Sequence, residues 1–334
     1  MPVPAALNRD RLQALLAGMH GRRVVVVGDA MLDVYLHGDV ERISPEAPVP
    51  VVRVRERRYA LGGAANVAQN VAATGAEGIL VGAVGRDAAG ARLRDMLVAL
   101  KADGRALLDV DRPTTTKTRI VARAQQVVRF DEEDDTDVSA DDVRRLTDAV
   151  SALVQEADAL VLEDYNKGVL VPSLIEGAIA QARRRGIPII VDPKFRNFFS
   201  FRGATVFKPN RRELESALGA AVALDAPDAL PDVFGRLGVD HLLLTLGERG
   251  MALVTASGVV HRIPTTAREV YDVVGAGDTV TAYLATAMAA GASAYEAAVV
   301  ANYAAGVEVG KLGAATVTPS EILEAYDHVH AHGT

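Results

Sequence analysis

The sequence contains no cysteine and no tryptophan, and aromatic residues make up only 4% of its 334 residues. Without cysteine the chain can form no disulfide, no thiolate metal site and no cysteine nucleophile. Because aromatic side chains are so few, the core has to be built from Val, Leu, Ile and Ala. Apolar residues account for 49% of the chain, which is ample for the core of a soluble globular protein.

Long apolar runs are also missing. The N-terminus lacks the apolar core of a signal peptide, and the most apolar late stretch, Val280 to Ala290, is too short to cross a bilayer. The net charge of −7 argues against a broad electrostatic grip on nucleic acid but leaves room for a local basic pocket. These features predict a cytoplasmic protein with neither a membrane nor a nucleic acid as its partner.

Two common nucleotide-binding fingerprints are absent. The segment from Gly306 to Leu312 has the wrong glycine spacing for a P-loop and lacks Ser or Thr after its lysine. The pair Gly275 and Gly277 lacks the third glycine of a dinucleotide-binding fingerprint and lies far from the first strand. Neither fingerprint therefore accounts for a nucleotide site in this chain.

Short apolar runs, separated by helix-like segments, recur along most of the chain. They are continuous rather than alternating, which indicates strands buried on both faces in a parallel sheet covered by helices. The runs are Val24–Val27, Ile79–Val81, Ala159–Leu162, Ile189–Val191, Thr205–Phe207 and His241–Thr245. We therefore predict one domain over residues 1–334, a three-layer α/β/α sandwich with a mostly parallel central sheet. Ligands are expected at the carboxyl edge of that sheet.

Two segments break this rhythm. Val34 to Arg58 alternates in part, and Thr114 to Asp131 is typical of a hairpin with a turn near Arg123–Gln125. We predict that residues of about 34–58 and 112–131 form a small separate sheet that acts as a lid. The alternative is that both are ordinary surface hairpins. The acidic run from Asp131 to Asp137 is interpreted as a solvated loop.

The run Gly275-Ala276-Gly277-Asp278 precedes an apolar helical segment. Glycines let the backbone approach a ligand closely, and a helix start offers unpaired N–H groups and a positive dipole end to an anion. An aspartate there can take the proton from a hydroxyl that attacks a phosphoryl group. The alternative is that Asp278 only favours the dipole of its helix.

Three other segments carry candidate binding residues. Gly62 and Gly63 precede a helix of small residues, where Asn66 could bond sugar hydroxyls, and Asp33 follows the first strand. Asn210 and Glu213 share a face at a helix start, which suits either a capping box or water ligands of a magnesium ion. The turn from Thr245 to Gly250 is either a plain hairpin or a nucleotide-contacting loop. For Gly62, Gly63 and Asn66 the alternative is a tight turn into a close-packed helix, and for Asp33 a loop or cap residue.

The order of these motifs resembles that of the ribokinase-like (PfkB) carbohydrate kinases, from about Val24 to about Thr318. The resemblance implies an ATP- and Mg²⁺-dependent kinase in which Asp278 deprotonates the sugar hydroxyl. It implies an anion hole of Gly275, Ala276 and Gly277. Sugar contacts are implied for Asp33, Gly62, Gly63 and Asn66. Nucleotide contacts are implied for Asn210, Glu213, Thr245, Gly247, Gly250 and Asn302, with Asn210 and Glu213 near the magnesium. A monovalent cation, K⁺ in many relatives, is implied beside Asp272, Val274, Gly313 and Thr316.

Within that family, three segments resemble the bacterial D-glycero-β-D-manno-heptose 7-phosphate kinases: Arg42–Val51, Pro113–Arg119 and Asp164–Gly168. The chain ends soon after the kinase motifs, which resembles the stand-alone form of those kinases and not the form fused to a nucleotidyltransferase. The resemblance implies phosphorylation of the 1-hydroxyl in lipopolysaccharide core biosynthesis. Another sugar, sugar phosphate or nucleoside is the alternative substrate, and a non-catalytic sugar-binding regulator is the alternative function.

A phosphorylated sugar requires cations. Lys117, Arg119 and Lys194 are the candidates, and the alternative is that they face solvent. Exposed edge strands of a small sheet are often covered by a partner, so we expect a homodimer formed through the lid.

Overall fold

The computed structural model describes residues 7–122, 125–224, 230–267 and 269–332. A nine-stranded sheet runs through the body in the order β13-β12-β11-β10-β9-β8-β1-β4-β5. Its strands are β1 (Arg23–Gly28), β4 (Glu77–Gly85), β5 (Asp103–Val110), β8 (Ala159–Glu163), β9 (Ile189–Asp192), β10 (Val206–Phe207), β11 (His241–Thr245), β12 (Met251–Thr255) and β13 (Val260–Ile263). All six predicted strands are present. The strands pair in parallel except at one edge, where β12 runs antiparallel to β11 and β13.

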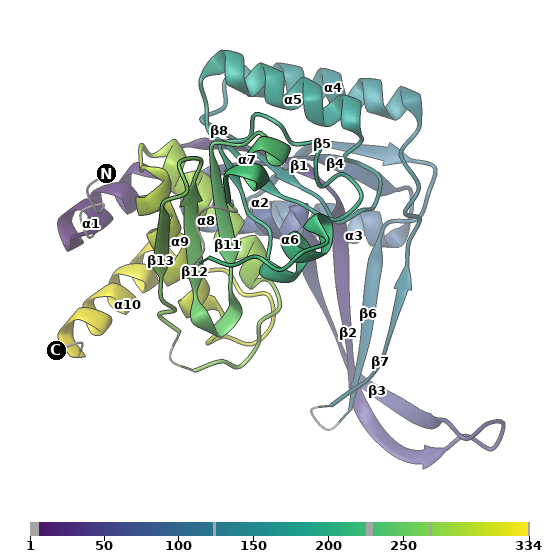
Figure 1. Ribbon diagram of the computed structural model, residues 1–334. Coiled ribbons are helices and arrows are strands. Elements are labelled where there is room, and N and C mark those ends of the chain that lie inside the picture. Colours follow the sequence, from purple (N-terminus) through teal and green to yellow (C-terminus); the bar gives the residue numbers. More distant parts are fainter. Residues whose placement is uncertain (1–6, 123–124, 225–229, 268, 333–334) are drawn as a thin grey trace.

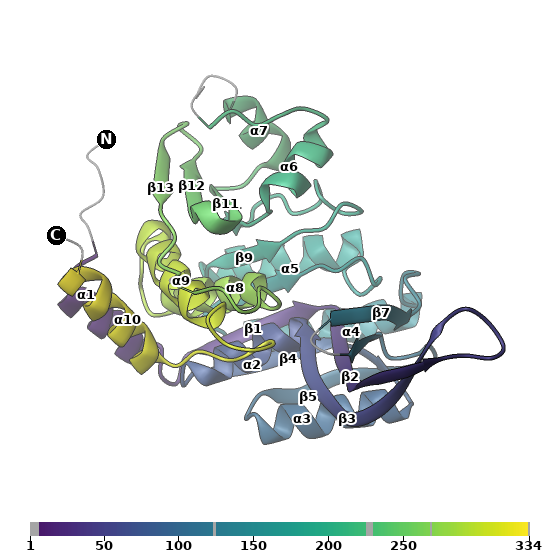
Figure 2. The same ribbon diagram turned by 90° about the horizontal axis from the view of Figure 1, so that it is seen from below.

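Helices cover both faces of this sheet (Figures 1 and 2), as predicted. One face is covered by α1 (Arg9–Gly18), α2 (Ala64–Ala73), α3 (Ala88–Ala99), α8 (Ala276–Ala289), α9 (Ala294–Glu308) and α10 (Pro319–His332). The other is covered by α4 (Ala140–Val154), α5 (Pro172–Arg185), α6 (Arg211–Leu218) and α7 (Leu230–Leu237). No described helix is both long and apolar enough to span a membrane.

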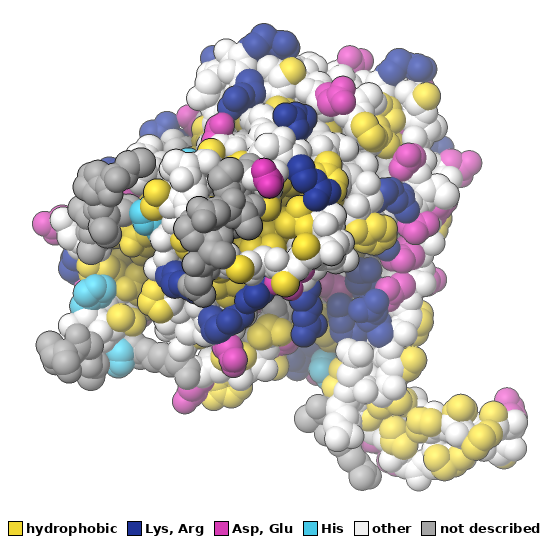
Figure 3. Space-filling view, in the orientation of Figure 1, with side chains coloured by type: hydrophobic (Ala, Val, Ile, Leu, Met, Phe, Trp, Pro, Cys, Tyr) yellow, Lys and Arg dark blue, Asp and Glu magenta, His cyan; other side chains and the backbone are white. Residues whose placement is uncertain are grey.

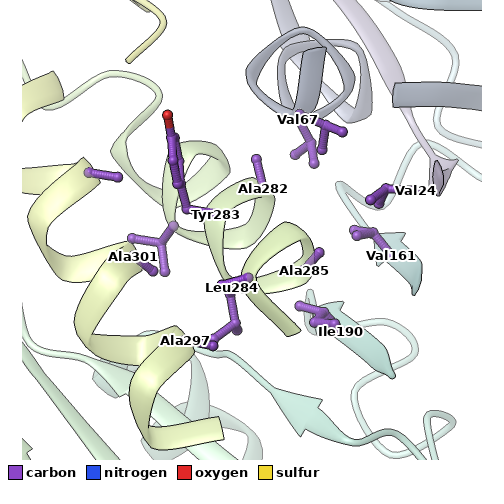
Figure 4. Packing of buried hydrophobic residues seen from close by; sticks show 14 of the residues in the cluster. Val24, Val67, Val161, Ile190, Ala282, Tyr283, Leu284, Ala285, Ala297 and Ala301 are labelled. Atoms are coloured by element: carbon purple, nitrogen blue, oxygen red, sulfur yellow. The ribbon is translucent and has the colours of Figure 1, made fainter. Parts of the chain in front are cut away.

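The continuous apolar strands explain why the core has two halves. Successive residues of a strand point to opposite faces. Val24 and Val26 of β1 therefore pack under α2 and α8, whereas Val25 and Val27 pack toward α4 and α5. Figure 4 shows the first half, where the small side chain of Ala285 on α8 faces Val161 and Ile190 of the strands.

A second sheet of four strands projects from the body (Figure 1), in the order β3-β2-β6-β7. Its strands are β2 (Ala30–Ile43), β3 (Pro50–Gly63), β6 (Thr116–Ala122) and β7 (Gln125–Glu132). This confirms a separate small sheet, but the predicted range 34–58 was too short. Since β2 begins directly after β1, and β3 ends directly before α2, the small sheet reaches down to the edge of the large one.

Three local predictions were wrong. Gln125 begins β7 and does not belong to the turn, whose other residues, 123 and 124, lie outside the described residues. Asp131 and Glu132 belong to β7, so the acidic run is only partly a loop. Helix α8 begins at Ala276, two residues before Asp278, because Gly275 at φ 95° serves as its N-cap.

Candidate active site

The site lies at the point where the strand order of the large sheet changes direction, on either side of β1. Strand β1 has β4 on one side and β8 on the other, and such a switch point is where ligands bind in open α/β sheets. The carboxyl ends of β1 and β8 meet there, with Gly28 opposite Glu163. Helix α8 packs across these strands and brings Asp278 to the same edge.

Asp278 is held by two side chains from distant parts of the chain. Its Oδ2 accepts a hydrogen bond from Asn66 Nδ2 at 2.7 Å, and its Oδ1 accepts one from the Tyr165 hydroxyl at 2.8 Å. Only 5% of Asp278 is exposed, and burial raises the pKa of its carboxyl to about 6 although both hydrogen bonds oppose the shift. The result is an oriented carboxylate that is ionised at neutral pH and basic enough to take a proton.

Asn66 is itself fixed in one orientation. Its Oδ1 accepts hydrogen bonds from Gln69 and Asn70, which leaves its amide group to donate to Asp278. The sequence predicted Asn66 as a sugar ligand; in the structure its side chain donates a hydrogen bond to the carboxylate of Asp278. Tyr165 was not predicted as a site residue, although it lies in one of the segments that carried the heptose kinase resemblance.

The start of α8 accepts only glycine at position 275. A Cβ there would lie 3.1 Å from Asn66 Nδ2, 3.2 Å from Ala314 Cβ and 3.3 Å from Glu308 Oε1, and φ is +95°. The first N–H groups of a helix have no partner within it, so this helix start presents donors and the positive dipole end to an anion, although the N–H of Ala276 makes a long 3.4 Å hydrogen bond to the carbonyl of Val273. The backbone therefore suits the predicted anion hole.

A cluster of buried charges lies behind Asp278. Carboxylate oxygens of Glu163, Asp192 and Asp278 all lie within 4.8 Å of one another. Lys208 donates to Asp192 at 2.9 Å. Burial favours protonated Asp192, but Lys208 and Lys194 outweigh it and lower the pKa of this carboxyl.

Glu163 is fully buried, and its oxygens have no hydrogen-bond partner among the described residues. Burial, together with the charges of Asp192 and Asp278, raises its pKa well above the usual range. Hard oxygen donors of this kind suit Mg²⁺. With Asp278 kept for the proton, Glu163 and Asp192 are the carboxylates that fit a magnesium ion. Neither was predicted, although acidic residues at the ends of neighbouring strands were a usable signal.

The Asn210–Glu213 pair forms a capping box, so the structural interpretation of this motif is confirmed. Glu213 also accepts from Lys194 Nζ at 2.7 Å. Lys194 lies 3.8 Å from Asp192 and over the ring of Tyr165, at the edge of the large sheet. It is therefore placed with the buried charges, whereas Lys117 and Arg119 lie on lid strand β6.

The other predicted nucleotide residues lie around β11 and the loop that follows β13. Asn210 pairs with Thr245 in an isolated parallel β-bridge, and the N–H of Thr245 donates to the carbonyl of Pro209. Gly247 and Gly250 have φ of +62° and +80° in the turn after β11. Asn302, on α9, donates to the carbonyl of Pro264 at 2.8 Å, on the loop that follows β13.

The two segments predicted to hold a monovalent cation also meet. Asp272 accepts from the N–H of Val274 at 3.0 Å and from that of Gly313 at 3.2 Å. The carbonyl of Thr316 accepts from Lys311 Nζ at 2.8 Å. Beside them lies Glu308, which sequence reasoning missed. It is fully buried, its oxygens have no partner among the described residues, and burial raises its pKa to about 8.

The lid supplies the remaining predicted residues. Asp33 accepts from Arg119 Nη1 at 2.6 Å, and Arg119 also lies over the ring of Tyr35. Asp33 lies against Gly62, where a Cβ would be 3.1 Å from its Oδ2. A Cβ on Gly63 would lie 2.4 Å from the carbonyl oxygen of Asp29, so only glycine fits there. The predicted sugar residues Asp33, Gly62 and Gly63 thus lie together on strands β2 and β3 of the small sheet.

The three-layer α/β/α fold, the buried carboxylate at a glycine-capped helix start and the small projecting sheet are the features of a sugar kinase. The family model of the pfkB family carbohydrate kinases matches residues 22–321. The chain belongs to this family and is an ATP-dependent carbohydrate kinase; kinases of the family use ATP and Mg²⁺.

Curated relatives agree with this assignment. The chain is 44% identical to the bifunctional protein HldE of Pelobacter propionicus over 334 residues, covering 97% of this chain and 67% of that protein. It is 46% identical to the bifunctional protein HldE of Caulobacter vibrioides over 317 residues, covering 94% and 65%. The chain thus spans about two thirds of these relatives.

The fold matches solved kinases of low sequence identity. The ribokinase of Arabidopsis thaliana, complexed with ribose and ATP, superposes with a TM-score of 0.72 at 22% identity, covering 91% of this chain and 98% of that one. Phosphofructokinase-2 of Escherichia coli, in complex with potassium, gives 0.76 at 18% identity, covering 93% and 99%. These matches confirm the ribokinase-like fold.

Proposed function

We propose that this kinase transfers the γ-phosphoryl group of ATP to the anomeric 1-hydroxyl of D-glycero-β-D-manno-heptose 7-phosphate, giving the 1,7-bisphosphate. The observation that carries a kinase reaction at this site is the Asp278 carboxylate, fixed by Asn66 and Tyr165 at the start of α8. The choice of sugar is supported by the lid segments that resemble heptose 7-phosphate kinases. It is further supported by the similarity to HldE proteins along 97% of the chain.

The proposed chemistry follows from the geometry. Asp278 takes the proton of the 1-hydroxyl as the oxygen attacks the γ-phosphorus, and the bond to the β-phosphate oxygen of ATP breaks. The N–H groups at the start of α8 stabilise negative charge on the transferred group. Mg²⁺, when bound, neutralises phosphate charge, and Glu163 and Asp192 are the residues that would hold it. The lid excludes water that would otherwise accept the phosphoryl group.

The predicted binding roles remain part of the proposal. Asp33, Gly62 and Gly63 line the sugar site, with Asn66 orienting the base. The nucleotide is assigned to Asn210, Glu213, Thr245, Gly247, Gly250 and Asn302. Potassium is assigned to Asp272, Val274, Gly313 and Thr316, where the N–H of Gly313 already meets Asp272. We place the reaction in the cytoplasm, in ADP-heptose and lipopolysaccharide core biosynthesis.

A homodimer through the lid is also proposed, with residues 1–334 as one kinase domain. Apolar side chains on the lid support the dimer, because Ile43, Val54, Val128 and Phe130 are 61%, 45%, 47% and 44% exposed. Large exposed apolar side chains on a projecting sheet suit a protein partner. The mass of the protein in solution, measured by light scattering, tests this.

The decisive experiment measures ADP release with heptose 7-phosphate, unphosphorylated heptose, fructose 6-phosphate and ribose, then locates the new phosphate by ³¹P NMR. We expect the highest kcat/KM for heptose 7-phosphate and a phosphate on C1. Asp278→Asn should lose nearly all turnover, because the carboxylate base is removed while the backbone donors remain, and ATP affinity should change little. Near-normal turnover in Asp278→Asn would contradict the base assignment. If none of the four sugars caused ADP release, the proposed substrate would be contradicted.

A further inference from the structure

Two lysines from separate parts of the fold meet on one carboxylate beside the sugar site. Lys167, in the loop after β8, contacts Glu133 Oε1 at 2.7 Å, and Lys117 of β6 lies 3.5 Å from Glu133 Oε2. The side chains of both lysines are only 15% exposed, and that of Glu133 is 26% exposed. Lysines are rarely so buried without a firm anionic partner. The arrangement therefore forms a half-buried anion site, occupied here by a side chain of the protein.

This site adjoins the residues assigned to the sugar. Lys117 is the neighbour of Asp33 in the parallel pairing of β6 with β2, so the two side chains share one face of the lid sheet. Two residues further along β6, on the same face, Arg119 reaches across to Asp33 at 2.6 Å. The face that carries Asp33 therefore continues into a row of cations. Figure 3 shows basic and acidic side chains gathered where β6 and β7 leave the body.

The loop that carries Lys167 is fixed to the catalytic carboxylate. Buried Asp29 accepts hydrogen bonds from the N–H groups of Tyr165, Lys167 and Val169. Two residues before Lys167, the Tyr165 hydroxyl donates to Asp278. One short loop thus positions both the base and a lysine. Lys194, the third cation predicted for the phosphate, contacts Glu213 and lies near Asp192. It therefore lies beside the carboxylates proposed for magnesium and not beside the two lysines.

We propose that Lys117 and Lys167 bind the phosphate group of the sugar substrate, and that Glu133 holds their place until that phosphate displaces it. This inference rests on the proposed function, since it requires a phosphorylated sugar. Two ammonium groups match a phosphate dianion in charge, and lysine binds phosphate as a compact charge without a fixed fork geometry. Lys117 keeps Asp131 as a second neighbour at 3.5 Å, so it has a partner in either state.

If Glu133 competes with the phosphate for the two lysines, its removal has a different effect from the removal of an ion pair that only stabilises the fold. Lys167→Ala should raise KM for the sugar phosphate by about 10- to 100-fold, the range of one charge-assisted hydrogen bond, and should raise KM for an unphosphorylated sugar far less. Glu133→Gln should do the opposite and lower KM for the sugar phosphate several-fold, since its competitor loses its charge. Misfolding cannot lower KM, so the second variant remains informative where the first is damaged.

The assay is coupled ADP detection with the sugar phosphate on which the wild type is most active, and Arg144→Ala, an exposed residue of α4, is the matched surface control. If that sugar phosphate is not heptose 7-phosphate, the substrate proposal fails while the lysine site is still tested. A Glu133→Gln KM equal to or above wild type, or a Lys167→Ala KM that does not change, would overturn the inference. A wild type that acts only on unphosphorylated sugars would overturn both.

Discussion

Removing the Tyr165 hydroxyl should shift the pH dependence of the enzyme. The hydroxyl donates to Asp278 at 2.8 Å. Burial raises the pKa of Tyr165 well above its usual value, so it remains protonated and remains the donor over the working pH range. The hydrogen bond favours the ionised form of Asp278 and therefore lowers its pKa. The pKa of about 6 is the net result of burial, which raises it, and of this bond and the one from Asn66, which lower it. In Tyr165→Phe only the bond from Asn66 remains.

The size of the shift follows from the energy of that bond. A hydrogen bond to a charged acceptor contributes about 1.5–3 kcal/mol, and one pKa unit corresponds to about 1.4 kcal/mol. The pKa of Asp278 should rise by about 1–2 units in Tyr165→Phe. A general base works only when ionised, so the acid limb of the kcat/KM profile should move upward by the same amount. Activity should be lost mainly below neutral pH and largely recovered at about pH 9.

The assay is the pH profile of kcat/KM for wild type, Tyr165→Phe and Tyr326→Phe. Tyr326→Phe is a matched control, because it also removes a buried hydroxyl, bonded to the carbonyl of Leu7 at 2.9 Å, but on α10. Its acid limb should match wild type. An unshifted acid limb in Tyr165→Phe would refute the claim that this hydroxyl sets the basicity of Asp278. A uniform loss at every pH would indicate structural damage instead.

Two further predictions concern the ends of α8 and α9. Gly275→Ala should lower both kcat and Tm, since φ of +95° and neighbours at 3.1–3.3 Å leave no room for a methyl group; activity assays and calorimetry check this, and an unchanged kcat would contradict the close approach. Glu308→Gln should raise Tm near pH 8. The pKa of Glu308 is about 8 in the folded protein against an ordinary 4.5, so the folded state binds more protons between these values and wild-type stability falls as pH rises through that window. The free energy of unfolding, measured between these pH values without potassium, should fall with rising pH in wild type and fall less in Glu308→Gln. Stability curves of the two proteins that run parallel across this pH range would contradict the prediction.

The large sheet was predictable because its signal is local. Runs such as Val24–Val27 are apolar on both faces, and in a globular chain only a doubly covered parallel sheet hides both faces of such a strand. The lid was less predictable. Its strands alternate only in part, and β2 and β3 continue directly from elements of the body, so no turn residue marks where the lid begins.

The site was predictable only where one residue type is required by the backbone. Gly275 and Asp278 form a short recognisable pattern because the positive φ of Gly275 and its close neighbours tolerate nothing larger than glycine. Glu163 and Glu308 carry no such pattern. Both are buried without a hydrogen-bond partner among the described residues, and burial is a property of the tertiary structure.

The electrostatic role of a residue was the least predictable feature of all. Lys117 and Lys194 look alike in the sequence, yet one lies on the lid beside Asp33 and the other contacts Glu213 near the magnesium side. Glu133, in an acidic run interpreted as solvated, lies between two lysines. A charge acquires a function only through the charges that the fold brings beside it, since Coulomb energies fall with distance and rise with burial. The proposed base Asp278 follows the same rule, because the two side chains that orient it, Asn66 and Tyr165, lie 212 and 113 positions away in the chain.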